Sequence, residues 1–181
     1  MKRLYFIRHG ESEFNASHVF WNGSSDTPLT PKGREQAKRA GQKAREEGLV
    51  FDVIISSPLT RAHDTAKHVA SELGYPHDEI VLDNYFVERD FGKLEGRKDL
   101  VAGTKYVIDE SAIDPYDGVE KLQDLQSRMD DFLTYLHSLP HDTILVVGHG
   151  GSGRALRRAI QKESLSKRGK SLHNAELMRF I

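Results

Sequence analysis

Two histidines of this sequence each follow a short apolar run. The run Leu4–Ile7 leads into Arg8 and His9, and the run Ile144–Val147 leads through a glycine into His149. Short apolar runs predict buried strands, and open α/β sheets build their active sites at the carboxyl ends of their strands. Two imidazoles, one with an arginine beside it, would then meet at one edge of a sheet. This pairing predicts phosphate chemistry at a histidine.

Three further features fit that chemistry. Arg61 falls in the first turn of a helix expected from Pro58, and Glu88 follows the apolar run Tyr85–Val87. Arginine forks bind phosphate oxygens bidentately and stay charged. A histidine held neutral beside such cations can attack phosphorus, and a second histidine can donate to the phosphoryl oxygens. A carboxylic acid can protonate the leaving oxygen and later take a proton from water. Backbone N–H groups could approach the phosphate at three glycines, Gly148, Gly150 and Gly151.

The composition is that of an ordinary globular protein. The chain has 181 residues, a net charge of −1, 38% hydrophobic residues and no cysteine, which fits one domain with a sizeable core. The charge balance gives no overall positive field for nucleic acid, and no apolar stretch approaches the roughly 18 residues of a membrane helix. Without cysteine there are no disulfides, thiolate nucleophiles or cysteine-ligated zinc. Because Leu4–Ile7 is reached without an apolar leader, we expect a cytoplasmic protein.

Predicted strands and helices alternate, which indicates an α/β domain with a largely parallel sheet. Thr30-Pro31 is typical of an N-cap and a first helical residue, and Gly48 of a helix end. The small residues on that helix predict close packing against a neighbour. The expected order is strand 4–7, loop 15–30, helix 31–47, strand 51–55, helix 58–73, extended pieces 80–82 and 85–87, a loop-rich insertion over 97–118, helix 122–137, strand 144–147, helix 152–161 and strand 175–181.

Four blocks of polar and glycine residues stand in order along the chain. They are Arg8-His9-Gly10-Glu11-Ser12 with Asn15, Ser56-Ser57-Pro58-Leu59-Thr60-Arg61-Ala62, Glu88-Arg89-Asp90-Phe91-Gly92 with Glu95-Gly96, and Gly148-His149-Gly150-Gly151 with Arg154. Gly23, Asp26, Pro28-Leu29-Thr30 and Asn174 accompany them. The set resembles the histidine phosphatase superfamily, also called the phosphoglycerate mutase-like family, from residue 4 to about 178.

The resemblance implies a fold and a set of roles. The fold is a three-layer α/β/α sandwich whose mostly parallel sheet includes an antiparallel edge strand, here a single domain over residues 1–181 with a short cap insertion at about 97–118. His9 would be the phosphorylated nucleophile, and Glu88 would give and take the proton. The groups that would bind the transferred phosphoryl are Arg8, Arg61 and His149. Asn15 and the Asn22-Gly23 turn would border the substrate pocket.

Two departures distinguish this chain from mutases of the family. The stretch between Gly10 and Gly23 is one residue longer than the common pattern, and Phe91 stands where mutases carry a tyrosine. The insertion 97–118 has three positive and five negative side chains, a net charge of −2. A mutase must retain a bisphosphorylated intermediate, which requires several cap cations. We therefore expect a phosphomonoesterase that hydrolyses a small phosphate ester through a phosphohistidine.

Several other functions are compatible with parts of this pattern. A cofactor-dependent phosphoglycerate mutase or a sugar bisphosphatase is the alternative within the family, and a non-catalytic module is opposed by the presence of both His9 and Glu88. Metal ligation by His9 and His149 is disfavoured by the flanking arginines and by the lack of a carboxylate at ligand spacing. We expect no metal and no cofactor. The expected partner is a small phosphorylated substrate, with no nucleic acid and no membrane; the pattern predicts no particular oligomeric state.

Overall fold

A computed structural model of the chain describes residues 2–19, 21–97, 118–164 and 171–181. Nearly all of the predicted insertion 97–118 lies outside these residues, so the single-domain architecture with a cap stays a prediction. The helices and strands are β1 (Arg3–Arg8), α1 (Glu13–Ala16), α2 (Pro31–Glu46), β2 (Val53–Ser56), α3 (Thr60–Leu73), β3 (Val81–Leu82), α4 (Leu122–Ser138), β4 (Thr143–Gly148), α5 (Gly150–Gln161) and β5 (Leu177–Arg179), with 3-10 turns at His77–Glu79, Asn84–Phe86 and Gly92–Leu94.

The five strands form one sheet in the order β3-β2-β4-β1-β5. β2 pairs in parallel with β3 and β4, and β4 pairs in parallel with β1. β5 runs antiparallel along β1 and forms one edge of the sheet. The mostly parallel sheet with an antiparallel edge strand, expected from the family resemblance, is confirmed.

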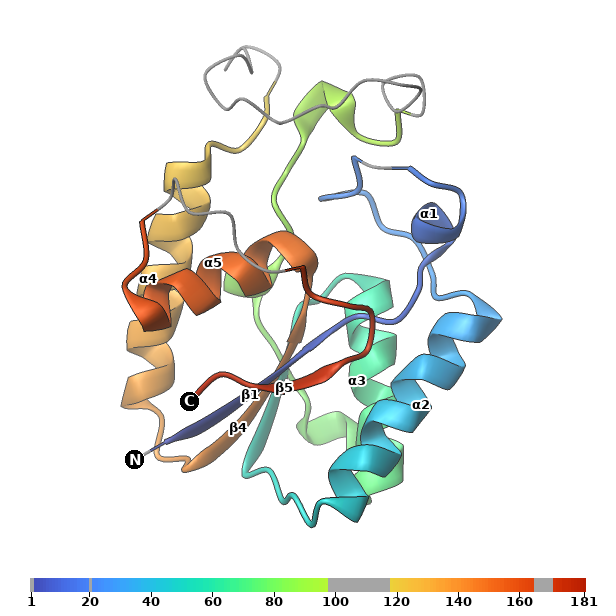
Figure 1. Cartoon of the computed structure of the whole chain (residues 1–181), viewed down its shortest axis with the longest axis vertical. Helices are drawn as coiled ribbons and strands as arrows, with labels where there is room; N and C mark the ends of the chain where they lie inside the picture. The colour runs from blue at the N-terminus through green and yellow to red at the C-terminus, as the bar shows by residue number, and fades with distance from the viewer. Residues whose placement is uncertain (1, 20, 98–117, 165–170) are drawn as a thin grey trace.

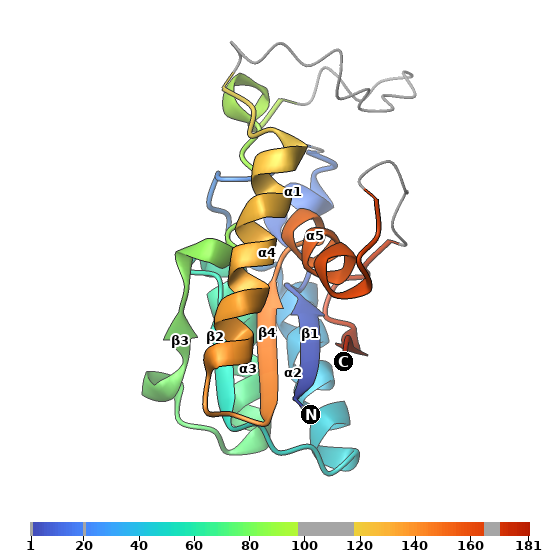
Figure 2. The same ribbon diagram turned by 90° about the vertical axis from the view of Figure 1, so that its left-hand side faces the viewer.

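Helices cover both faces of this sheet: α4 and α5 lie to its left and α2 and α3 to its right in Figure 1, and α4 crosses in front of the strands in Figure 2. Successive residues of β1 point to opposite faces: Phe6 packs in a core with α4 and α5, while Ile7 packs in a second core with α2 and α3. β4 divides its residues in the same way. The central strands are therefore buried on both sides, which explains why they are continuous apolar runs rather than alternating ones.

The helix α2 packs closely on α3, as its small residues predict. Thr30 caps it by accepting a hydrogen bond from the N–H of Gly33, and Pro31 stands at its first position. A Cβ at Gly41 would lie 2.8 Å from Cβ of Glu72 and 2.9 Å from the carbonyl oxygen of Val69. Only a glycine therefore allows this approach. None of the described helices is long and apolar enough to cross a bilayer.

Four elements differ from the expectations. The short helix α1 extends into the start of the predicted loop 15–30. A capping box between Ser12 and Asn15 begins this helix. The expected extended piece 85–87 is instead a 3-10 turn that ends at Phe86, because the Asp83 side chain accepts from the N–H of Tyr85 and turns the chain. The helix expected from 152 begins at Gly150, and the one expected from Pro58 begins at Thr60.

Candidate active site

The two histidines meet because their strands are neighbours (Figure 1). Arg8 lies opposite Gly148 in the register of β1 and β4, so the residues that follow, His9 and His149, leave the sheet side by side. The N–H of His9 donates to the carbonyl of Gly148 at 2.8 Å. The two imidazole rings lie edge to face, with centroids 5.2 Å apart.

Hydrogen bonding defines the tautomer of His9. Its Nδ1 lies 2.7 Å from the carbonyl oxygen of Gly10. Only an N–H can bond to a carbonyl oxygen, so Nδ1 carries the hydrogen and Nε2 keeps its lone pair. Burial, reinforced by the positive charges of Arg61 and Arg8, holds the pKa of His9 well below its ordinary value. The ring is therefore neutral at pH 7, with Nε2 as the available nucleophile.

His149 is fully buried and has one free nitrogen. Its Nε2 lies 2.8 Å from Oγ of Ser57, while Nδ1 has no hydrogen-bond partner. Ser57 Oγ accepts from the N–H of Leu59 and can donate its own hydrogen to Nε2, in which case Nδ1 carries the N–H. Burial, reinforced by the positive charges of Arg61 and Arg8, holds the pKa of His149 well below its ordinary value.

Arg61 is completely buried, and its terminal nitrogens are already used by the protein. Nη1 donates to the carbonyl of Ser25 at 2.8 Å and Nη2 to that of Gly23 at 2.7 Å. Its Nε has no partner. Burial lowers the pKa of the guanidinium, against the opposing charge of Glu88, but an arginine stays protonated in proteins. The loop 23–25 thus fixes the position of this cation.

Arg8 is anchored in the same manner. Its Nη1 donates to the carbonyl of Leu172 at 2.9 Å, and its Nε is buried without a partner. Burial lowers its pKa as well, with Glu88 again opposing. In the described part of the chain, neither Arg8 nor Arg61 has a carboxylate within ion-pair distance. The positive charge of both guanidinium groups is therefore available to a bound anion.

A single carboxylate, Glu95, organises the loop that holds Arg61. It accepts hydrogen bonds from the backbone N–H groups of Gly23, Ser24 and Ser25 at 3.0–3.2 Å and from that of Phe91 at 3.0 Å. Burial acts to raise the pKa of Glu95, but these N–H groups outweigh it and the pKa is lowered. The loop carbonyls are consequently turned toward Arg61.

Glu88 lies at the amino end of α5. Its Oε2 accepts from the N–H of Gly151 at 2.7 Å, and its Oε1 accepts from the N–H of Ser152 at 3.0 Å. Helix N-termini favour negative groups. The expectation that the glycine N–H groups here would be left for phosphate is therefore corrected at Gly151, whose N–H is taken by Glu88. Gly148 is required for packing, since a Cβ there would lie 2.0 Å from Cε1 of Phe86.

A pocket of about 470 Å³ lies over these groups. Six of the residues predicted for the site line it: Arg8, His9, Asn15, Asn22, Glu88 and Gly150. The other three are buried behind the lining, namely Arg61, His149 and Gly23. Gly23 contributes its carbonyl to Arg61 rather than a surface to the pocket. The predicted residues thus come together as two groups, one that lines the pocket and one that is buried.

The pocket also involves two residues that were named in the sequence blocks without a role at the site. Arg154 lines the pocket; a Cβ at Gly150 would lie 3.3 Å from its Nη1 and 3.6 Å from Nε of Arg8. The position of Arg154, one helical turn after Gly150, was the available signal. Asn174 donates to the carbonyl of His9 at 2.8 Å and to Oδ1 of Asn15 at 3.3 Å. Its match to a late asparagine of the family was the signal there.

The departures from the mutase pattern also lie at this pocket. Phe91 lines it, and its ring stands edge to face with that of Trp21 at a centroid distance of 5.1 Å. Trp21 is 3% exposed, so it packs beneath Phe91 rather than facing a substrate. His18, Val19 and Gly151 complete the lining. The pocket is therefore lined by the cations Arg8 and Arg154 and by the apolar side chains of Phe91 and Val19.

Comparison with known proteins agrees with this geometry. A sequence profile of the histidine phosphatase superfamily (branch 1) matches residues 4–180. The chain belongs to the histidine phosphatase superfamily. In this superfamily member, the matched residues include His9 and His149 with the strands that precede them, the helix α3 that carries Arg61, and the antiparallel strand β5.

The relatives of this histidine phosphatase superfamily member include both mutases and phosphatases. It is 37% identical over 171 residues to a 2,3-bisphosphoglycerate-dependent phosphoglycerate mutase of Brucella melitensis, with 88% of this chain and 82% of the relative covered. A mycobacterial glucosyl-3-phosphoglycerate phosphatase solved with VO3 is 25% identical, with a TM-score of 0.83 over 99% of this chain and 92% of that one. Bacillus stearothermophilus YhfR has 26% identity and a TM-score of 0.81, covering 99% and 90%. The protein is therefore an enzyme of phosphate chemistry.

Proposed function

We propose that this protein is a metal-independent phosphomonoesterase that hydrolyses a small phosphate ester through a phosphohistidine at Nε2 of His9. One observation carries the proposal. In the described part of the chain, three buried nitrogens around His9 have no hydrogen-bond partner, namely Nε of Arg8, Nε of Arg61 and Nδ1 of His149. Buried donors are otherwise almost always paired, so unpaired ones beside a neutral nucleophile suit the oxygens of a phosphoryl group.

The first half of the reaction transfers the phosphoryl group to the enzyme. The Nε2 lone pair of His9 attacks phosphorus in line with the leaving oxygen, and the P–O bond breaks as the P–N bond forms. Glu88, as the carboxylic acid, gives its proton to the leaving oxygen. Arg8, Arg61 and His149 stabilise the charge on the phosphoryl oxygens, and one such donor contributes roughly 100- to 1000-fold to kcat.

The second half returns the enzyme to its starting state. Water attacks the phosphohistidine, and the Glu88 carboxylate takes a proton from it. The P–N bond breaks, its electron pair returns to Nε2 of His9, and inorganic phosphate leaves. Because the arginines supply the positive charge that Mg²⁺ provides in other phosphoryl transferases, no step needs a metal.

Water, rather than a second phosphoglycerate, is the proposed acceptor. Phe91 presents an apolar ring to the pocket where mutases carry a tyrosine, and the insertion 97–118 has a net charge of −2. Both features disfavour retention of a bisphosphorylated acid. The small phosphorylated partner and the cytoplasmic location stay predictions from the sequence.

A phosphoglycerate mutase is the second candidate. The 37% identity to Brucella mutases supports it, and Arg154 adds a further cation to the pocket. Interconversion of 3-phosphoglycerate and 2-phosphoglycerate, stimulated by 2,3-bisphosphoglycerate and faster than phosphate release, would favour this candidate. Release of phosphate without interconversion would favour the phosphatase.

Rapid acid quench with ³²P-labelled ester would not preserve a phosphohistidine, so the phosphoenzyme is best trapped by quenching in base. We expect a base-stable, acid-labile adduct in the wild type and neither adduct nor turnover in His9→Ala. The matched control is His137→Ala, an exposed histidine of α4, which should behave as wild type. Near-normal turnover of His9→Ala would overturn the proposal.

A further inference from the structure

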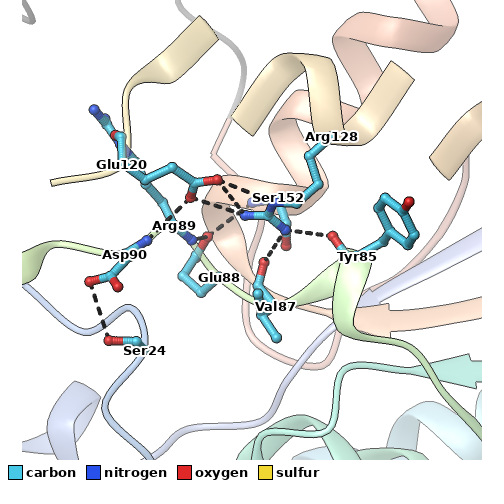
Figure 3. A network of polar contacts seen from close by, with 9 residues as sticks. All are labelled: Ser24, Tyr85, Val87, Glu88, Arg89, Asp90, Glu120, Arg128 and Ser152. Carbon is cyan, nitrogen blue, oxygen red and sulfur yellow. Dashed lines mark hydrogen bonds and ion pairs between the residues drawn. The ribbon is translucent and has the colours of Figure 1, made fainter. Parts of the chain in front are cut away.

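A fork-to-fork ion pair lies beside the segment that carries Glu88 (Figure 3). Arg128, on α4, donates through Nε and Nη2 to both carboxylate oxygens of Glu120 at 3.0–3.1 Å. Both side chains are 19% exposed. Bidentate pairs of this kind have a defined geometry as well as charge attraction.

The remaining nitrogen of the same guanidinium holds the chain that precedes Glu88. Nη1 of Arg128 donates to the carbonyl of Val87 at 3.0 Å and also to that of Tyr85. These carbonyls belong to a 3-10 turn and the residue after it, where neighbouring strands do not supply donors. Arg128 therefore attaches the turn to α4, which is packed in the core through Leu125 and Met129.

Glu120 holds the chain that follows Glu88. Its carboxylate accepts from the N–H of Asp90 at 3.3 Å, and its carbonyl accepts from Nε of Arg89 at 2.8 Å. Its own N–H donates to the carbonyl of Asp90 at 2.9 Å. Glu88 thus lies between residues 85–87, which are bound by Arg128, and residues 89–90, which are bound by Glu120. The ion pair connects Arg128 and Glu120 to each other.

We infer that Arg128 and Glu120 act as a positioning pair that holds the Glu88 carboxyl group at the pocket for proton transfer. The inference rests on the proposed role of Glu88 as general acid. Neither member of the pair lines the pocket, so both act through the backbone of residues 85–90. Proton transfer needs hydrogen-bond reach, and small displacements of the acid are costly for catalysis.

The test uses leaving groups that differ in their need for an acid. Arg128→Lys keeps the charge but cannot form the fork. We expect its kcat/KM for an alkyl phosphate to fall roughly ten-fold or more, since a general acid contributes about 100- to 10,000-fold in total. The kcat/KM for p-nitrophenyl phosphate should change by less than about two-fold, because that leaving group needs little protonation. This parameter reports phosphoryl transfer to His9 and excludes the later attack of water, in which Glu88 acts as the base. Inhibition by inorganic phosphate should stay unchanged.

Glu120→Gln provides a second variant that retains the backbone contacts, and Arg39→Lys, an exposed arginine of α2, is the matched control. Glu120→Gln should show the same alkyl-selective loss, and Arg39→Lys none. In a Glu88→Gln background, Arg128→Lys should cause no further loss, since groups that act through one another are not additive.

Two outcomes separate this inference from the proposed function. If Glu88→Gln discriminates between the leaving groups while Arg128→Lys and Glu120→Gln slow both substrates equally, or add fully to Glu88→Gln, the positioning role is overturned and the acid role stands. If Glu88→Gln itself slows both substrates equally, the acid role fails and the positioning role fails with it. Phosphohistidine formation at His9 is measured independently of either result.

Discussion

The Oε2 atom of Glu88 accepts a 2.7 Å hydrogen bond from the N–H of Gly151, and a Cβ at that glycine would lie 2.3 Å from Oε1 of Glu88. The proposed acid and the first turn of α5 therefore fit together only because residue 151 has no side chain.

Gly151→Ala should displace the Glu88 carboxylate while leaving the nucleophile in place. We expect kcat/KM for an alkyl phosphate to fall by about ten-fold or more, with a much smaller loss for p-nitrophenyl phosphate. Ser152→Ala, which keeps its own N–H and removes only a hydroxyl without a hydrogen-bond partner, is the control. Equal kinetics for Gly151→Ala and Ser152→Ala would contradict the prediction.

Stability should fall as the pH drops through 6.5. Burial holds the pKa of both His9 and His149 well below that of an unfolded histidine. Below pH 6.5 the unfolded chain binds protons that the folded chain excludes, so each histidine lowers the free energy of unfolding by up to about 1.4 kcal/mol per pH unit. Above about pH 7.5 the two contribute no slope.

Urea unfolding at pH 5 and pH 7.5 measures this effect. A His9→Asn, His149→Asn double variant should lose much of the pH dependence, whereas His137→Asn, at an exposed position of α4, should retain it. An unchanged slope in the double variant would assign the acid sensitivity to other groups.

Much of this arrangement was predictable from the sequence because apolar runs place strands well. The runs ending at Ile7 and Val147 became β1 and β4, and the histidines after them meet as expected. The start of α5 was missed because its N–H groups are capped by Glu88, from a segment far away in the sequence, and local patterns cannot reveal such a cap. Arg128 was missed for a related reason, since an arginine on an amphipathic helix is usually solvated.

Glu95→Gln should weaken phosphate binding through Arg61. The amide has only one acceptor oxygen for the N–H groups of Gly23, Ser24 and Ser25, so the loop carbonyls that hold Arg61 would shift. We expect about 1–2 kcal/mol less stability and a several-fold higher inhibition constant for inorganic phosphate. Glu11→Gln, which breaks an ion pair with the exposed Lys32, should have little effect on either measurement. Stability loss with unchanged phosphate inhibition would limit Glu95 to a structural role.

Chelation should leave turnover intact. Arg8, Arg61 and His149 provide the donors that the phosphoryl oxygens need, so prolonged dialysis against EDTA should not lower kcat. Vanadate, which can adopt a five-coordinate geometry like that of the transition state, should inhibit strongly. Loss of activity in EDTA with recovery on adding a divalent ion would disprove the proposed mechanism.

The order of strands in the sheet has a consequence for how the protein folds. Arg3 pairs with Thr143 and Ile7 with Leu177, so β1 has no strand partner in the described chain until residues 143–179 have been synthesised. Pairing over such long separations is slow, and the unpaired apolar strand is prone to aggregate in the meantime. Substitutions in β5 should therefore reduce the yield of folded protein in cells and increase its dependence on chaperones, while the turnover of the purified enzyme should change less.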